Sequence, residues 1–329
     1  MYYIQVKKIL FISIPALIFI STGAVLTEKS NEKISWPNRI FDAKVNDYNV
    51  YRELGRRLFY EPAISADGTI SCASCHSPFN SFAHADHRLS HGIHDSIGRR
   101  NAPALVNLAW QNSFMWDGAI LNLKAVPLAP IHHKGEMASS IEYALNAVNQ
   151  SPDFSHWLMS RKLYPLNTEV FTDALAIFLS SLVSENSRYD QMQRGEVIFN
   201  EQEKRGYDLF RTHCNRCHTE PLFTNGTLSR NGLPEDSILH DLGLESISGN
   251  ANDRHKFKIP TLRNLLYSSP YMHDGRFARL NDVLKFYATD ERSPIGKSIN
   301  PEQRTDLMIF LKTLNDSSFV FNPDNQYPN

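Results

Sequence analysis

Apolar residues recur at helical spacing in two long stretches of the chain. From Thr168 to Val183 they return every three or four positions, so they would line one face of a helix. The same spacing runs from Pro301 to Leu314, with the proline where the first turn of a helix tolerates it. Each stretch therefore predicts an amphipathic helix.

A shorter pattern occurs twice. The segments "LGRRLF" (Leu54 to Phe59) and "RGYDLF" (Arg205 to Phe210) both read G-x-x-L-F within an amphipathic helical pattern. Internal similarity of this kind indicates duplication. We expect two related halves that each begin with a helix and that meet near "SRYDQMQRGE", residues 187–196.

An apolar run near the start has the features of a secretory signal. Lys7 and Lys8 precede "ILFISIPALIFI", and the small residues "STGA" follow it. This order predicts export to the periplasm with cleavage near Ala24. Because the apolar stretch extends to Leu26, an uncleaved anchor in the inner membrane stays open.

The charges of the chain nearly cancel. The 329 residues include 34 Lys and Arg against 35 Asp and Glu. Such a balance gives no basis for a nucleic-acid-binding surface. We therefore expect no nucleic-acid partner.

All four cysteines lie in two copies of one motif. The copies are "CASCH" (Cys72, Cys75, His76) and "CNRCH" (Cys214, Cys217, His218). C-x-x-C-H is the attachment signal of c-type haem, in which the thiols bond to the vinyl groups and the histidine is the proximal iron ligand. Disulfide frameworks belong to shorter chains, and a zinc site does not require His after each second Cys. The sequence therefore predicts two c-type haems.

Two long segments lack clear periodicity. Residues 77–134 and 219–269 are rich in Gly, Pro, Asn and Asp. Because unstructured loops of this length are uncommon in compact domains, we expect ordered loops wrapped around the haems. No strand pattern is strong enough to predict a sheet.

Several further motifs occur in a characteristic order, namely "RRNAPALVN", "FMWDG", "EM", "KIPTLRN" and "PYMHDGRF". With the two haem motifs, they make the chain resemble the bacterial di-haem cytochrome c peroxidase family, which includes MauG-like enzymes, over roughly residues 48–315. The resemblance implies a mainly α protein of two cytochrome c-like domains, each with one covalently bound haem. It implies that the N-terminal haem meets peroxide and that the C-terminal haem passes or stores electrons.

These features predict a division of the chain. Residues 1–26 would be the signal peptide or anchor and residues 27–47 a linker. Residues 48–190 would form the N-terminal, peroxidatic domain, and residues 191–329 the C-terminal, electron-transfer domain.

The resemblance assigns catalytic roles to residues near the first haem. Trp116 of "FMWDG" matches the tryptophan that conducts electrons between the haems, and Glu136 matches the distal glutamate. A carboxylate above the iron can take a proton from peroxide and return it to the leaving oxygen. The family usually has Gln where this chain has Val126, so a hydrogen-bond partner for peroxide is lost or replaced; His132 and His133 are nearby candidates.

A distal histidine is a second expectation for this haem. In members that rest in an inactive form, a loop histidine caps the iron. The segment "AHADHRLSHGIHD" offers His84, His87, His91 and His94, of which His91 matches the family position best. MauG-like members carry no such ligand, so both states stay open.

The resemblance also implies a calcium ion between the domains. The matching positions are the side chain of Asn101 and the backbone carbonyls of Ser268 and Pro270. Oxygen ligands suit Ca²⁺, but no acidic cluster supports the site independently, and Asn101 could simply cap a turn.

The distal ligand of the second haem has two candidates. Chemistry alone favours Met272, because a thioether is a common ligand in electron-carrying haems. Family spacing favours Tyr287, which lies 14 positions after His273, as in MauG-like members. A tyrosinate would lower the reduction potential and favour higher oxidation states. In that case Met272 would pack beside the haem and His273 would form hydrogen bonds in a turn.

The expected function is that of an exported di-haem peroxidase that reduces H₂O₂ with electrons from a small c-type cytochrome or a cupredoxin. One alternative is a MauG-like enzyme that uses peroxide to oxidise a side chain of a partner protein. Another is a di-haem electron-transfer cytochrome without catalysis. A homodimer is possible with each.

Overall fold

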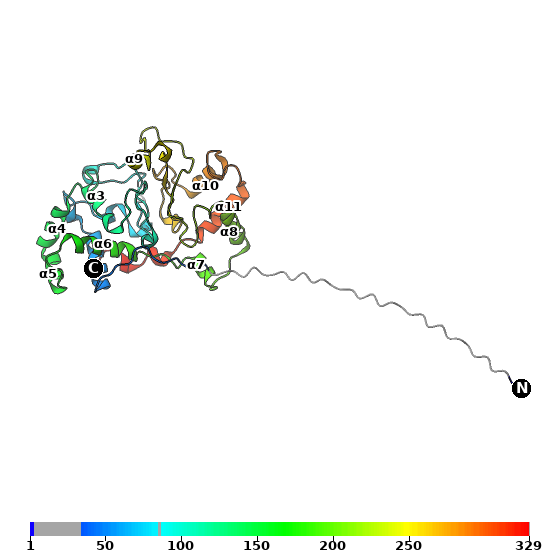
Figure 1. Cartoon of the computed structure of the whole chain (residues 1–329), viewed down its shortest axis with the longest axis horizontal. Helices are drawn as coiled ribbons and strands as arrows, with labels where there is room; N and C mark the ends of the chain where they lie inside the picture. Colours follow the sequence, from blue (N-terminus) through cyan, green and yellow to red (C-terminus); the bar gives the residue numbers. More distant parts are fainter. Residues whose placement is uncertain (3–33, 85–86, 329) are drawn as a thin grey trace. The chain divides into compact units, whose positions relative to one another are not determined.

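Two pairs of packed helices form the framework of the protein. In the computed structural model, α1 (Tyr48–Phe59) packs against α6 (Thr168–Ser181), and α8 (Glu201–His213) packs against α11 (Pro301–Lys312) (Figure 1). Both helices predicted from periodicity are confirmed as α6 and α11. Both G-x-x-L-F stretches lie in helices as well, in α1 and α8.

Local capping explains where these helices begin. Asn200 and Glu203 form a reciprocal capping box at α8, and Asn300 forms one with Gln303 at α11. The side chain of Asp47 accepts a hydrogen bond from the Val50 N–H at the start of α1. Each contact satisfies an N–H group that has no partner within the helix.

The repeated glycine explains the close approach of both pairs. A Cβ atom on Gly55 would overlap the carbonyl oxygen of Ala174, and one on Gly206 would overlap that of Asp306. The next contact is equivalent too, since a Cβ atom at either glycine would lie 2.8 Å from the Cβ of a phenylalanine, Phe178 or Phe310. The sequence repeat therefore encodes the same helix crossing twice.

The structure describes residues 1–2, 34–84 and 87–328. Most of the expected signal or anchor lies outside these residues. Within them, no helix is long and apolar enough to cross a membrane. Residues 34–329 form one compact unit.

Two hydrophobic clusters lie within this unit. The first contains buried residues between Leu54 and Leu182, and the second contains buried residues between Tyr189 and Leu314. Phe319 and Val320, on the C-terminal helix α12 (Ser317–Val320), return to the first cluster. The end of the chain thus packs against its first half.

The remaining elements are short. The other helices are α2 (Cys72–Cys75), α3 (Leu128–His132), α4 (Ile141–Gln150), α5 (Pro152–Ser160), α7 (Arg188–Gln193), α9 (Glu245–Ser248) and α10 (Leu280–Thr289). The strands β1 (Leu228–Ser229) and β2 (Phe257–Lys258) pair antiparallel. No sheet was predicted, because strands of two residues are too short to leave an alternating pattern.

Long-range polar contacts hold the two long loops. Arg100 in the first loop donates two hydrogen bonds to Asp241 in the second, at 2.7 and 2.8 Å, and a third to Asp117 at 2.5 Å. Arg88 donates to the carbonyl of Asp274 at 2.7 Å. Arginines of the first half therefore bind loops of the second. That these loops wrap around the haems stays a prediction.

The described part of the expected linker also makes specific contacts. The N–H groups of Ile40 and Phe41 both donate to the carbonyl of Ala109, at 2.8 and 2.9 Å. The ring of Trp36 lies 5.0 Å from that of Trp110, whose indole N–H donates to the Pro37 carbonyl at 2.8 Å. Residues 36–41 thus pack along the first half.

Candidate active site

The first C-x-x-C-H motif presents a histidine with one ring nitrogen free. α2 begins at Cys72, and His76 follows its last residue. The Nδ1 atom of His76 lies 2.8 Å from the carbonyl oxygen of Phe82. Since a carbonyl can only accept, Nδ1 carries the proton and Nε2 keeps its lone pair for a metal. Burial, with a smaller effect of His84, lowers the pKa of His76 to about 4, so the ring is neutral near pH 7.

The second motif repeats this arrangement. Cys214 caps the end of α8, and the Nδ1 atom of His218 lies 3.2 Å from the Phe223 carbonyl and 3.1 Å from the Pro260 carbonyl. Burial lowers the pKa of His218 to about 4 as well. Both histidines are therefore oriented as proximal iron ligands are, with Nδ1 fixed by the backbone.

The cysteines fit thioether attachment better than a zinc site. All four thiols are unpaired. Burial raises the pKa of Cys72 and of Cys214 to about 12, which disfavours the thiolates that zinc requires. Within the described residues, no group of three or more Cys, His, Asp or Glu side chains is arranged to hold a metal ion. The residues present therefore fit covalently attached haem at both motifs.

A carboxylate faces the first motif. The charge of Glu136 acts on the thiols of both Cys72 and Cys75, which shows that the fold brings it to this motif. Burial raises the pKa of Glu136, and His133 opposes that shift. The Nδ1 atom of His133 lies 3.6 Å from Oε1 of Glu136, too far for a good hydrogen bond but close enough for a charge interaction.

Val126 and His132 have other surroundings. Val126 packs against the first hydrophobic cluster. His132 is exposed at the end of α3, and its charge acts on Glu142. Of the two histidines considered as replacements for the usual Gln, His133 is the one beside Glu136.

Three of the four candidate loop histidines gather near the first motif. The ring of His87 lies 4.2 Å from that of His91 and 5.4 Å from that of His84. The carbonyl of His91 accepts a hydrogen bond from the thiol of Cys75 at 3.2 Å. His94 lies apart, with 77% of its side chain exposed, near a carboxylate oxygen of Asp67.

Tyr287 and Met272 meet at a residue that the sequence did not single out. Burial raises the pKa of Tyr287, and the thiols of the second motif act in the same direction, so this buried phenol on α10 lies near that motif. The side chain of Asn231 partly offsets the raised pKa of Tyr287, and its amide nitrogen lies 3.7 Å from the sulfur of Met272. Nothing in "LSRNGLP" signals this role, because only tertiary folding brings the loop to α10.

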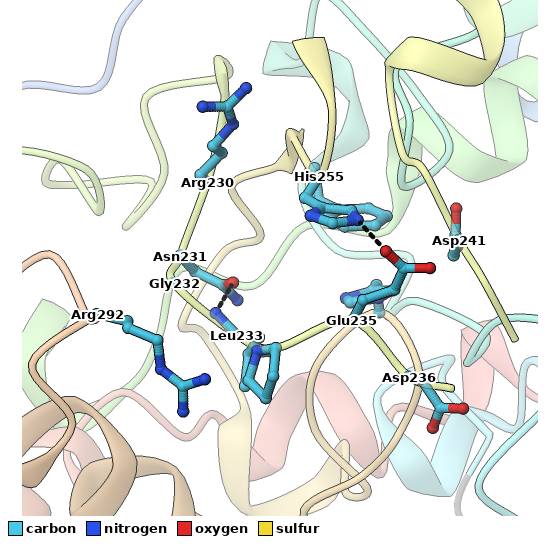
Figure 2. Close-up of a pocket in the computed structure, with 12 residues that line it drawn as sticks. Arg230, Asn231, Gly232, Leu233, Glu235, Asp236, Asp241, His255 and Arg292 are labelled. Carbon is cyan, nitrogen blue, oxygen red and sulfur yellow. Dashed lines mark hydrogen bonds and ion pairs between the residues drawn. The ribbon is translucent and has the colours of Figure 1, made fainter. Parts of the chain in front are cut away.

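A cavity of about 220 Å³ opens beside Asn231 (Figure 2). Glu235 lies at its wall and is paired with His255, 3.2 Å away, and with His240, 2.8 Å away. The remaining lining residues come from the loop after β1, from the segment 255–273 and from the turn that follows α10, and include Arg230, Asp236, Asp241, Phe257, His273 and Arg292. The cavity therefore adjoins Asn231, whose side chain also contacts Met272.

Trp116 lies at the seam between the halves. Its indole N–H donates to the Asn101 carbonyl at 2.8 Å, and its own carbonyl accepts from the Lys258 N–H at 2.7 Å. Its ring and that of His273 meet edge to face, with the centroids 6.5 Å apart. The ring of His273 stacks on that of Phe257 with the centroids 3.7 Å apart, so ring packing fixes its position. The backbone carbonyl of His273 accepts a hydrogen bond from the Asn101 N–H.

The residues expected at calcium lie in ordered backbone near this seam. Asn101 is 5% exposed, and its side-chain N–H donates to the Arg88 carbonyl at 3.1 Å. Ser268 follows the 3-10 turn Leu265–Tyr267, and Pro270 follows a cis peptide bond. Calcium binding by these residues stays a prediction.

Comparison with known proteins identifies relatives along nearly the whole chain. A family model described as di-haem cytochrome c peroxidase matches residues 50–197. The chain is 30% identical to a cytochrome c551 peroxidase of Nitrosomonas europaea over 94% of its own length and 92% of that protein's. It is 31% identical to the methylamine utilization protein MauG of Methylorubrum extorquens, over 79% of this chain and 77% of the relative.

Solved structures share the fold. A MauG-like protein associated with microbial copper homeostasis superposes with a TM-score of 0.77 at 27% identity, covering 89% of this chain and 98% of that one. The di-haem peroxidase BthA of Burkholderia thailandensis gives a TM-score of 0.74 at 22% identity, covering 90% and 93%.

Proposed function

Because the chain belongs to the di-haem cytochrome c peroxidase family and is therefore a peroxidase, we propose that it is an exported enzyme that reduces H₂O₂ to water in the periplasm. Electrons would come from a small c-type cytochrome or a cupredoxin. The observation that carries this proposal is the carboxylate of Glu136, which lies near the thiols of the first C-x-x-C-H motif and has a raised pKa.

The family implies two c-type haems, and we assign their attachment residues. Cys72, Cys75 and His76 hold the first haem, while Cys214, Cys217 and His218 hold the second. When bound, the iron supplies a site for peroxide and exchanges electrons with it. We assign residues 48–190 to the peroxidatic domain and residues 191–329 to the electron-transfer domain.

Glu136 acts as the general acid and base. Its carboxylate accepts the proton of the attacking peroxide oxygen and then donates it to the leaving oxygen, so that water departs instead of hydroxide. A pKa raised by burial favours the first step, because it makes the carboxylate a stronger base than that of an exposed glutamate. His133, whose Nδ1 atom lies 3.6 Å from Oε1 of Glu136, is the nearby polar side chain that we propose in place of the amide lost at Val126.

Trp116 conducts electrons between the two sites. Its contacts with Lys258 and His273 of the second half and with Asn101 of the first support this role. Asn101, with the carbonyls of Ser268 and Pro270, would hold a calcium ion at the same seam. In the resting enzyme His91 would cap the first iron, if the chain behaves as a conventional cytochrome c peroxidase.

A MauG-like activity is the second candidate, in which peroxide oxidises a side chain of a partner protein. The nearness of the buried Tyr287 phenol to the thiols of the second motif supports it. Tyr287 would then be the distal ligand of the second haem, and Met272 would pack beside Asn231. A purely electron-carrying cytochrome fits less well, because it would have no use for Glu136.

Stopped-flow absorption of the holoprotein tests the proposal. Oxidised and half-reduced enzyme are each mixed with one equivalent of H₂O₂. Reaction without prior reduction supports the MauG-like form with an open site, and reaction only after half-reduction supports a site capped by His91. Peroxide turnover that survives Glu136→Gln would refute the acid–base role, and a ferric spectrum unchanged by Tyr287→Phe would refute its ligation.

A further inference from the structure

Two tyrosines share one carboxylate oxygen beside the second motif. The hydroxyl groups of Tyr189, on α7, and Tyr207, on α8, both donate to Oε2 of Glu220, at 2.5 and 2.6 Å. Glu220 comes two residues after His218, the assigned proximal ligand. None of these three residues has a part in the peroxide chemistry assigned above.

A short series of contacts joins Tyr189 to His218. Tyr189 is fully buried, and its ring packs edge-on against that of Phe223 with the centroids 4.8 Å apart. The carbonyl of Phe223 is one of the two that lie within hydrogen-bonding distance of His218 Nδ1. Tyr189 therefore lies one residue removed from the proximal ligand, within the second hydrophobic cluster.

A buried arginine fixes both partners of the hydrogen bond. Arg263 is 1% exposed and donates to both carboxylate oxygens of Asp190 at 2.8 Å. It also donates twice to the carbonyl of Pro221, at 3.0 and 2.8 Å. Because Asp190 follows Tyr189 and Pro221 follows Glu220, Arg263 fixes the backbone next to both residues and keeps the Tyr189 hydroxyl close to the Glu220 carboxylate.

This arrangement differs from that of other buried tyrosines. Tyr60 donates to the carbonyl of Asn325 at 2.7 Å, and Tyr271 donates to that of Leu265 at 2.8 Å. An amide carbonyl is a very weak base, whereas a carboxylate can take up a full proton. Only a tyrosine paired with such a base can lose an electron without becoming a buried cation.

We propose that Tyr189 is an internal electron donor to the second haem and that Glu220 accepts its proton. In the enzyme oxidised by H₂O₂, the O–H bond of Tyr189 breaks. One electron passes to the oxidised haem centre, the proton forms a new O–H bond at Oε2 of Glu220, and a neutral tyrosyl radical remains. The inference rests on the proposed peroxide reaction, which supplies the oxidant.

Two further features fit this role. Burial, with the charge of Glu220, raises the pKa of Tyr189, so the phenol keeps its proton until it is oxidised. Glu220 also lines a surface groove of about 450 Å³, together with Pro37, Trp110 and Asn225. The groove gives the transferred proton a route to solvent, and an electron from an external donor would restore the tyrosine.

The test uses full-length holoenzyme frozen within milliseconds of mixing with H₂O₂ in the absence of an electron donor. Electron paramagnetic resonance is recorded on natural protein and on protein containing ring-deuterated tyrosine, alongside haem absorption. We expect a radical whose spectrum changes with the deuterated ring and which is lost in Tyr189→Phe and in Glu220→Gln. Tyr60→Phe is the matched control and should keep it.

Each contrary outcome is distinct. A tyrosyl radical that persists in Tyr189→Phe or in Glu220→Gln would overturn the assignment. Haem bands that respond to peroxide without any tyrosyl radical would overturn this inference alone, and haem bands that do not respond would overturn the proposed function with it. A merely structural hydrogen bond would change thermal unfolding in Glu220→Gln but would leave the radical signal in place.

Discussion

The contact between His133 and Glu136 leads to a defined pH dependence of the peroxide reaction. Burial raises the pKa of Glu136, and the charge of His133 lowers it. His133→Gln keeps a polar side chain but removes the charge. The pKa of Glu136 should then rise further, so that its carboxylate becomes protonated at a higher pH. The acid limb of the plot of rate against pH should therefore move to higher pH.

The geometry sets the size of this shift. The charges are 3.6 Å apart, and the side chains of His133 and Glu136 are 61% and 40% exposed. At this distance, a water-like dielectric gives about 1 kcal/mol of Coulomb energy. We therefore expect a shift of about 0.7 pH units at low salt, since one pKa unit corresponds to about 1.4 kcal/mol.

Stopped-flow measurement of the second-order rate constant across the acid range provides the assay. His132→Gln is the control, because this adjacent histidine acts on Glu142 instead. Salt should reduce the difference between wild type and His133→Gln, since the Debye length falls to about 3 Å at 1 M. An acid limb that stays in place at low salt, or that moves to lower pH, would refute the charge interaction.

Three other substitutions probe the framework and the seam. Trp116→Phe should leave the first reaction with peroxide intact but slow the sharing of oxidising equivalents between the haems, measured by rapid-scan absorption; equal rates would rule out conduction through Trp116. Gly206→Ala should lower the free energy of unfolding, measured by urea titration, by about 1–3 kcal/mol or more, because the new Cβ atom would overlap the Asp306 carbonyl. Lys204→Ala, on the exposed face of α8, is the control and should change the free energy of unfolding little. Burial raises the pKa of Asp190, but Arg263 outweighs this effect and holds the pKa below its usual range. Asp190→Asn should therefore lower the free energy of unfolding by about 3–5 kcal/mol above about pH 4. The difference from wild type should shrink as the pH falls through the lowered pKa, and a difference independent of pH would contradict the ion pair.

The long helices could be predicted because their signal is local. α6 and α11 begin at the predicted residues, Thr168 and Pro301, and end within two residues of the predicted ends. The defined conformation of the loops has no such local signal in the sequence. It depends on pairs such as Arg100 with Asp241, whose separation in sequence gives no periodic pattern.

The candidate site divides in the same way. Cys72, Cys75 and His76 are neighbours in sequence, so their motif is visible without any structure. Asn231 is a single residue in a loop, and only the approach of that loop to α10 brings it to Tyr287. Glu220 is equally inconspicuous in the sequence, because the whole of α8 separates it from its partner Tyr189.

The two halves share their proximal architecture but differ on the opposite side. Both use a glycine at the helix crossing and a backbone carbonyl to orient the motif histidine. These features belong to the repeated helices and motifs, so duplication preserves them. The groups near the motifs differ between the halves. Glu136 of the first half lies in a loop, whereas in the second half Tyr287 lies on α10 and Asn231 in a loop. A side chain in such a segment can change without disturbing the helix crossing, and the two halves can therefore take different roles on one framework.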